Sequence, residues 1–177
     1  MKRISFTTLS LLLTLSFWKC EKDDICADGT PVTPRVVIEF YDATATGSLK
    51  NVTNLRVEEI STGNGVIFNK NLTLDNPARY LTNANTIAIP LKSFDTTSAF
   101  EFKFNYSNGS ENTDVVTFSY TTKNEYISRA CGYKTIFQLN PTNAVVLTPD
   151  AINWIQNIVV TQSNIDNENE IHVKIYF

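Results

Sequence analysis

The chain has 177 residues, of which 42% are hydrophobic and 19% charged, and its formal net charge is −3 at pH 7. This length suits one domain with a sizeable hydrophobic core. A nucleic-acid partner is not predicted, because phosphate binding needs a concentrated basic face and 15 basic residues are spread among 18 acidic ones.

The first 19 residues predict a lipoprotein signal peptide. Lys2 and Arg3 form a short basic start, and an apolar stretch rich in Leu and Phe follows up to Trp18. This stretch is shorter than the roughly 20 apolar residues that cross a membrane. An ordinary small-x-small cleavage pattern is missing, whereas Cys20 lies where bacterial lipoproteins carry the cysteine that receives diacylglycerol. We therefore predict lipid attachment at Cys20.

Lys19 leaves a second interpretation of this segment open. The residue before a lipidated cysteine is normally small, and lysine is not. An uncleaved or otherwise processed anchor is therefore the alternative to lipidation. With lipid on Cys20, we expect the protein at the outer membrane, on its periplasmic face or at the cell surface.

The rest of the chain divides into a tether and a domain. Cleavage before Cys20 would remove three basic residues and leave 158 residues with 12 basic and 18 acidic side chains, a formal charge of −6. Residues 20–34 are polar and contain Asp, Gly and Pro, which is typical of an acidic tether. Residues 35–177 are predicted to form a single domain.

Three cysteines are present, at positions 20, 26 and 131. If Cys20 carries lipid, an even pair remains in an oxidising compartment, which predicts a disulfide between Cys26 and Cys131. A bridge that closes a loop of about 100 residues contributes up to about 4 to 5 kcal/mol in the chain-entropy treatment.

From Arg35 onward, apolar and polar residues alternate with a period of two, as in half-buried strands. Val36, Ile38 and Phe40 would face one side of the first strand and Glu39 the other. Turn signals at 63–65 and 107–109 separate later strands. Further strands are predicted at 55–60, 66–68, 86–91, 99–106, 114–121, 126–137, 158–164 and 171–177.

Helical patterns are scarce, and only Thr148-Pro149-Asp150 could cap a short helical turn through Asn153. Short strands without intervening helices indicate an antiparallel sandwich or barrel. We predict an all-β fold, an antiparallel β-sandwich of about eight strands, Ig-like or similar.

An aromatic row lies on one face of a predicted strand and comprises Phe100, Phe102, Phe104 and Tyr106. Such a row could be a platform for stacking sugars, but a sandwich core requires the same pattern. The core interpretation is preferred, because exposed aromatic rows of this length favour aggregation.

Cys131 could be a thiol nucleophile, with the only histidine, His172, as its base. The disulfide is preferred in a secretory context. Alternation places His172 opposite Ile171 and Val173, on a face in contact with solvent. A single histidine supplies no zinc ligand set.

Two further features have a functional and a structural interpretation. The stretch 166–170 holds three carboxylates that calcium would accept, but it lacks the glycine and spacing of an EF-hand, so a solvated turn is preferred. Arg129 shares a strand face with Cys131 and Tyr133, and an interior position would require a structural partner. We predict no catalytic residue, no metal and no cofactor.

Several segments resemble a family of small lipoproteins of Bacteroidota (flavobacteria) that is classed as a domain of unknown function. The most specific are Ser128-Arg129-Ala130-Cys131-Gly132-Tyr133 and the start, in which five residues separate Cys20 from Cys26. The others are 16–18, 37–42, 54–57, 87–91, 153–156 and 172–175. The resemblance implies an envelope lipoprotein and supplies no activity, substrate or catalytic residue. Lys22-Asp23-Asp24 also resembles the acidic signal that exports some such lipoproteins to the outer face.

We therefore predict a non-enzymatic binding or structural module, anchored to the membrane by its lipid, with an envelope protein or a glycan as partner. A surface carbohydrate-binding protein is the alternative, for which an exposed aromatic pair such as Trp154 with a tyrosine would be the evidence. A glycan-acting enzyme comes third and requires two carboxyl groups that converge in one pocket.

Overall fold

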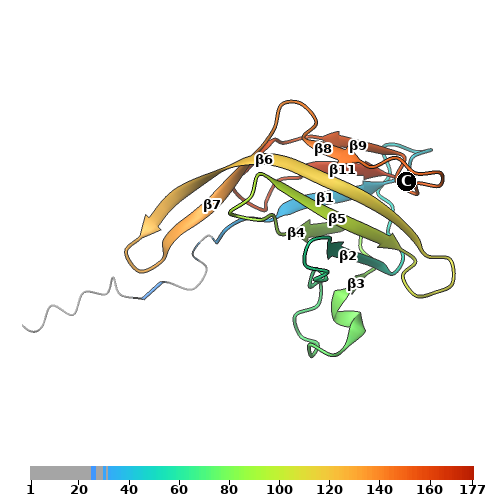
Figure 1. Ribbon diagram of the computed structural model, residues 1–177, viewed down its shortest axis with the longest axis horizontal. Coiled ribbons are helices and arrows are strands. Elements are labelled where there is room, and N and C mark those ends of the chain that lie inside the picture. Colours follow the sequence, from blue (N-terminus) through green and yellow to red (C-terminus); the bar gives the residue numbers. More distant parts are fainter. Residues whose placement is uncertain (1–24, 27–29, 31) are drawn as a thin grey trace, which may run out of the picture. The chain divides into compact units, whose positions relative to one another are not determined.

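The computed structural model describes residues 25, 26, 30 and 32–177, and these form two β-sheets (Figure 1). The chain divides into two compact units. One, which we call the hairpin unit, comprises Met1–Thr30 and Tyr126–Tyr133; the other, the sandwich unit, comprises Pro31–Glu125 and Lys134–Phe177. The predicted all-β sandwich is confirmed.

The smaller sheet has four strands in the order β4-β1-β11-β9. Its central pair, β1 with β11, is parallel, with Ile38 opposite Val173 and Phe40 opposite Ile175. The other two pairs are antiparallel. The bounds are β1 Val36–Tyr41, β4 Thr86–Ile89, β9 Asn157–Val160 and β11 Val173–Tyr176.

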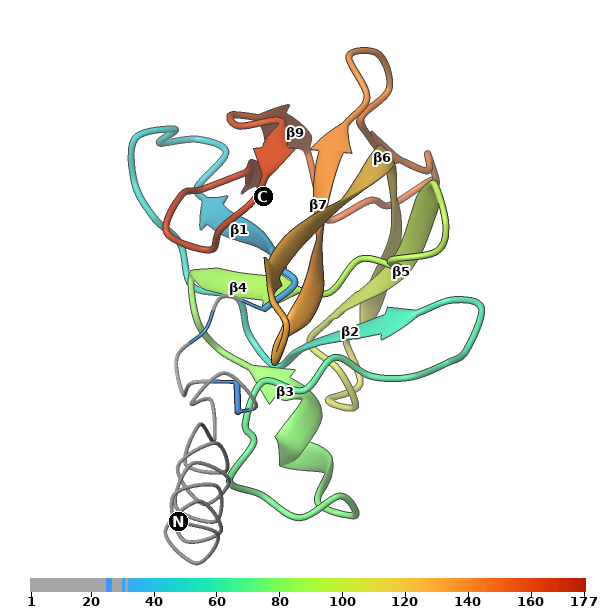
Figure 2. The ribbon, with the colours of Figure 1, turned by 90° about the vertical axis from the view of Figure 1, so that its left-hand side faces the viewer.

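The larger sheet has the order β10-β7-β6-β5-β2-β3, and β8 pairs with β6 beside this path. Figure 2 shows β1, β4 and β9 on one side of the core and β2, β5 and β6 on the other. The bounds are β2 Leu55–Glu59, β3 Leu81–Thr82, β5 Thr97–Phe104, β6 Asn112–Ser128, β7 Gly132–Leu139, β8 Val145–Leu147 and β10 Asn164–Ile165.

Buried apolar side chains of both sheets fill the space between them. Phe100 and Phe102 of the aromatic row are fully buried, and Phe104 packs against them from the edge. Tyr106 is half-buried, with the Arg56 guanidinium 4.9 Å from its ring centroid. The three phenylalanines therefore belong to the core, as predicted, whereas Tyr106 lies past the end of β5 and contacts Arg56 instead.

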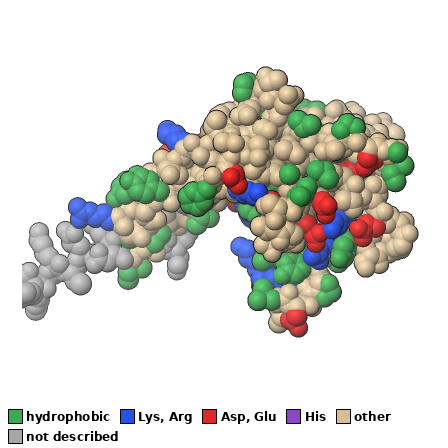
Figure 3. All heavy atoms as spheres, viewed as in Figure 1, with side chains coloured by type: hydrophobic (Ala, Val, Ile, Leu, Met, Phe, Trp, Pro, Cys, Tyr) green, Lys and Arg blue, Asp and Glu red, His purple; other side chains and the backbone are tan. Residues whose placement is uncertain are grey.

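Charged residues cover the outer face of β2 and β5, opposite the core. Glu58 lies directly across from Glu101, and Arg56 across from Lys103, so the directly opposite pairs have like charges. Glu58 compensates for this repulsion, because it pairs with Arg56 along the same strand and with Lys103 diagonally across the two strands. Figure 3 shows acidic and basic side chains gathered side by side in the region of β2.

Four predicted elements differ from the structure. The strand predicted over 158–164 is divided into β9, which ends at Val160, and β10, which begins at Asn164 in the other sheet. Residues 66–68 form no strand, and residues 148–153 form no helix but contain a turn. The strand predicted over 126–137 is instead a hairpin, because β6 ends at Ser128 and β7 begins at Gly132, whose φ of +71° suits glycine. A 3-10 helix at Pro77–Tyr80 was not predicted, although Asn76 caps it and Pro77 occupies its first position.

His172 is fully buried, so the prediction of a solvent-facing histidine is wrong. Its backbone N–H donates to the Val37 carbonyl oxygen at 3.0 Å, and its Nδ1 accepts from the Val37 N–H at 2.9 Å. His172 and Val173 are both buried because β11 begins only at Val173. The alternation that predicted exposure therefore does not extend to His172.

The burial of His172 predicts a loss of stability in mild acid. Desolvation lowers its pKa from 6.5, and the nearby carboxylates of Asp166, Glu168 and Glu170 oppose this only in part. The unfolded chain thus binds the proton more readily than the folded chain. The free energy of unfolding, measured with urea, should fall as the pH drops below about 6.5, by at most about 1.4 kcal/mol per pH unit.

His172→Asn is the matched control, since an amide oxygen can accept from Val37 but does not titrate. Its unfolding free energy should change much less between pH 7.5 and 5. Carboxylates with a lowered pKa, such as Glu59 at about 2, lose their contribution only below about pH 4.5. Equal slopes in both proteins would contradict the assignment to His172.

Two phenylalanines allow a direct test of the core. Phe102 is fully buried between the sheets, whereas Phe94 is fully exposed. We expect Phe102→Ala to lower the free energy of unfolding by about 3 to 5 kcal/mol, because it removes buried apolar surface and leaves a cavity. Phe94→Ala should change it by less than about 0.5 kcal/mol. Similar losses for the two variants in guanidinium unfolding would show that this core is misplaced.

Candidate functional site

The sandwich unit contains a cleft of about 710 Å³. Its volume lies within the range of small-molecule sites, and apolar side chains dominate its lining. The side chains that the following paragraphs use come from three stretches of chain, 32–35, 59–70 and 88–92, together with Phe100 and Glu168.

The floor of the cleft belongs to the core. Val66, Leu91 and Phe100 reach it and are all buried. Val66 is held there by the turn after β2, in which Gly63 has a φ of +67° and the Val66 N–H donates to the Val57 carbonyl oxygen at 2.8 Å. The turn signal at 63–65 therefore positions one side of the cleft.

An ion pair between Arg35 and Glu168 forms one wall. Glu168 accepts from the Arg35 backbone N–H at 3.0 Å, from Nε at 2.9 Å and from Nη2 at 2.6 Å. These hydrogen bonds lower the pKa of Glu168 and raise that of Arg35. Both groups stay charged, and the geometry is the bidentate one that arginine favours with a carboxylate.

A second ion pair, between Lys92 and Glu59, lies at another part of the lining, with Nζ 2.8 Å from Oε1. Glu59 ends β2, and its carboxylate also accepts from Ser61 and Thr62 in the following turn. Burial alone would raise the pKa of Glu59, but the hydrogen bonds from Lys92 and the turn outweigh it and lower the pKa to about 2.

The carboxylates of this cleft are therefore ionised at neutral pH. A general acid needs a pKa raised toward the working pH, and the pKa values of Glu59 and Glu168 are both lowered. Each carboxylate also forms an ion pair, Glu59 with Lys92 and Glu168 with Arg35. The arrangement suits binding better than proton transfer to a leaving group.

Lys70 differs from the other two cations of the lining. Its side chain is exposed and forms no hydrogen bond or ion pair with any residue that the structure describes, although its charge acts on Glu168. Arg35 and Lys92 are both engaged with carboxylates. Lys70 is thus the cation that a ligand can use.

A smaller cleft of about 380 Å³ adjoins the first and shares four of its residues, among them Arg35 and Glu168. It lies along the edge strand β4, from which Thr86 and Ala88 contribute to the lining. Ala88 lines both clefts. Together they form one groove past this edge of the four-stranded sheet.

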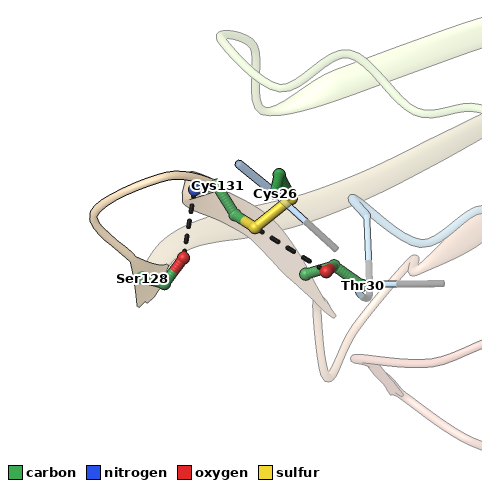
Figure 4. Close-up of a disulfide and its surroundings, with 4 residues drawn as sticks. All are labelled: Cys26, Thr30, Ser128 and Cys131. Atoms are coloured by element: carbon green, nitrogen blue, oxygen red, sulfur yellow. Dashed lines mark hydrogen bonds between the residues drawn. A yellow bond between two sulfur atoms is a disulfide. The ribbon is translucent and has the colours of Figure 1, made fainter. Parts of the chain in front are cut away.

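Of the predicted site residues, Cys20 lies outside the described part of the chain, and so does most of the predicted tether. Cys26 and Cys131 are joined in the hairpin unit by a disulfide with an S–S distance of 2.02 Å (Figure 4). Ser128 Oγ accepts from the Cys131 N–H at 3.1 Å and closes the turn that carries Cys131. With its sulfur in this bond, Cys131 is not a thiol nucleophile.

One residue of the acidic stretch 166–170 has a structural role, because Glu168 forms an ion pair with Arg35. Among residues 25, 26, 30 and 32–177, no three His, Cys, Asp or Glu side chains come together as a metal site would require. Arg129 is exposed in the turn between β6 and β7, so the interior partner considered for it is not needed.

The aromatic pair considered at Trp154 is not exposed. Trp154 packs against the core, stacks on Phe104 with centroids 4.9 Å apart, and donates from Nε1 to the Phe102 carbonyl oxygen. An exposed pair lies instead in the hairpin unit. Tyr126 and Tyr133 are 55% and 68% exposed, with ring centroids 5.3 Å apart.

Sequence reasoning did not identify the cleft. Arg35 and Glu168 are 133 residues apart; Arg35 stands at the start of the first predicted strand, and Glu168 in a stretch predicted as a solvated turn. Glu59 and Lys92 are likewise far apart in the sequence, because a long segment of chain joins β2 to β4. No local pattern marks such partners, because only the sheet topology brings them together.

Comparison with protein families matches residues 54–177 to the Family of unknown function (DUF6452). No curated protein and no solved structure matches the chain. Within the described ranges, no helix has the length and apolar character needed to cross a membrane. Because the family match spans more than half of its residues, the chain belongs to the Family of unknown function (DUF6452).

Proposed function

We propose that this chain is a lipid-anchored protein of the bacterial cell envelope that binds a ligand without transforming it. The apolar segment that ends at Cys20, the acidic residues after it and the resemblance to Bacteroidota lipoproteins support the anchor and an outer-membrane location. The lipid attaches the protein to the membrane, and the folded domain binds a partner in the envelope.

The observation that carries the binding role is the cleft with its ionised walls. An apolar floor and a few placed charges are what ligand sites share. Glu59 and Glu168 both carry a lowered pKa and both engage a cation, so neither is suited to supply a proton. This supports a binding module over a glycan-acting enzyme.

Replacement of the lipid-bearing cysteine tests the anchor. In cells fed an alkyne fatty acid, the wild-type chain should become labelled and should partition into the detergent phase of an extract. Cys20→Ala should abolish the label and move the protein to the aqueous phase, because the acceptor thiol is gone.

Cys26→Ala is the matched control, since it removes a cysteine but leaves Cys20. It should keep the fatty-acid label and the detergent partitioning. Undiminished labelling of Cys20→Ala would refute the anchor, whatever the cleft binds.

A carbohydrate-binding role is the second candidate, and the exposed rings of Tyr126 and Tyr133 favour it. They lie beside the Cys26–Cys131 disulfide in the same unit, which restrains the turn between them. Exposed aromatic rings present an apolar face with a polar tip, the combination on which sugar rings stack.

Purified envelope polysaccharide, immobilised for an affinity measurement, tests this candidate. If the rings form a sugar platform, Tyr133→Ala should weaken binding by about 5- to 10-fold, the loss expected for one stacked ring. Phe94→Ala, which removes an exposed ring in the sandwich unit, should leave binding unchanged. No binding by the wild-type chain, or equal losses in both variants, would eliminate the platform.

A further inference from the structure

The charges of the 710 Å³ cleft do not cancel. Arg35, Lys70 and Lys92 contribute three positive charges, and Glu59 and Glu168 contribute two negative ones. The two carboxylates are committed to Arg35 and Lys92. Lys92 also lies 3.7 Å from Asp95, which is outside the lining. Lys70 is the lining cation with no carboxylate partner in the described part of the chain, and we call its charge the left-over charge.

The left-over charge lies beside apolar surface. Val66, Leu91 and Phe100 form the floor but are already buried, so the apolar surface open to a ligand comes from the exposed Val32 and Pro90 and the half-buried Ile67 and Ala88. A ligand that covers this surface removes it from water, which favours association. The cleft therefore favours a ligand that has an apolar part and an anionic part, which contact different residues of the lining.

Ligands with other properties fit these walls less well. A cationic ligand would meet Lys70, and both carboxylates of the lining already have a cation. A sugar would find no exposed aromatic ring face, because Phe100 is almost fully buried. A ligand with several negative charges would need more unpaired cations than the lining offers. A ligand with a single anionic group and an apolar body complements both the charge and the apolar surface of the lining.

We propose that this cleft binds a fatty acid, with its carboxylate at Lys70 and its hydrocarbon chain against Val32, Ile67 and Pro90. The inference rests on the proposed binding role and names its ligand class. The size of the cleft suits one small ligand rather than a two-chain lipid. Free fatty acids derived from envelope lipids are the source to which the proposed membrane anchor would give access.

The charge of the ligand head group gives the first test. The probe is a 12-carbon fatty acid with a photoreactive diazirine near its tail, applied to the full chain in lipid nanodiscs. Illumination followed by mass spectrometry should place the crosslink in residues 64–67 or 90–92, and excess laurate should prevent it. A 12-carbon amine with the same diazirine should give at least about tenfold less crosslink, because its head group repels Lys70.

Lys70→Glu reverses the charge on the cleft and should reduce crosslinking at least about tenfold. The matched control is Lys123→Glu, a charge reversal at an exposed position of β6 in the same unit, which should crosslink like the wild type. Ala88→Phe adds bulk where the two clefts meet and should block the probe.

Three results would overturn the proposal: crosslinks outside the cleft, equal labelling by acid and amine, or equal labelling of Lys70→Glu and the wild type. Because Lys70 is exposed, its replacement leaves the core intact and the outcome stays interpretable if Ala88→Phe fails to fold. Undiminished fatty-acid labelling of Cys20→Ala would refute the anchor, whereas a cleft that rejects fatty acid refutes only this ligand, so the two failures are distinguishable.

Discussion

The parallel pairing of β1 with β11 is the constraint on which the rest of the sandwich unit depends. It joins the first strand of the domain to the last, so residues 35–37 lie beside residues 168–172. The Arg35–Glu168 wall of the cleft and the buried position of His172 both follow from this register. Such a distant pairing closes a long loop at an entropic cost, which places it among the slower steps of folding.

The two ends of this pair have different chemistry. At one end, the Phe177 N–H donates to the Tyr41 carbonyl oxygen, and the Phe177 ring packs against Phe40 and Trp154. At the other end, polar contacts of Arg35 and His172 replace aromatic packing. The cleft lies at the polar end, so ligand contacts there need not disturb the aromatic cluster that closes the core. The aromatic contacts that close the core and the polar contacts that line the cleft are thereby separated along the same two strands.

The fold class could be predicted from alternation, because strands with one buried face have a period of two. Val36, Ile38 and Phe40 illustrate this, since all three are buried as the pattern indicates. Parallel pairing leaves no such local signal. The burial of His172 is mispredicted because this residue precedes β11, where the alternation does not apply. The pairing of Cys26 with Cys131 was accessible from cysteine count and compartment, whereas the cleft was not, because its walls combine side chains more than 100 residues apart.

The Arg35–Glu168 pair fixes the path of the backbone more than it contributes to the free energy of folding. The two side chains are 39% and 31% exposed, and pairs this accessible to water contribute about 0 to 1 kcal/mol to stability. Their three hydrogen bonds nevertheless fix the backbone of Arg35, because one of them comes from its N–H. The chain therefore enters the domain along a set path, and that path is a wall of the cleft. A contact that contributes little to folding can in this way determine the shape of the cleft.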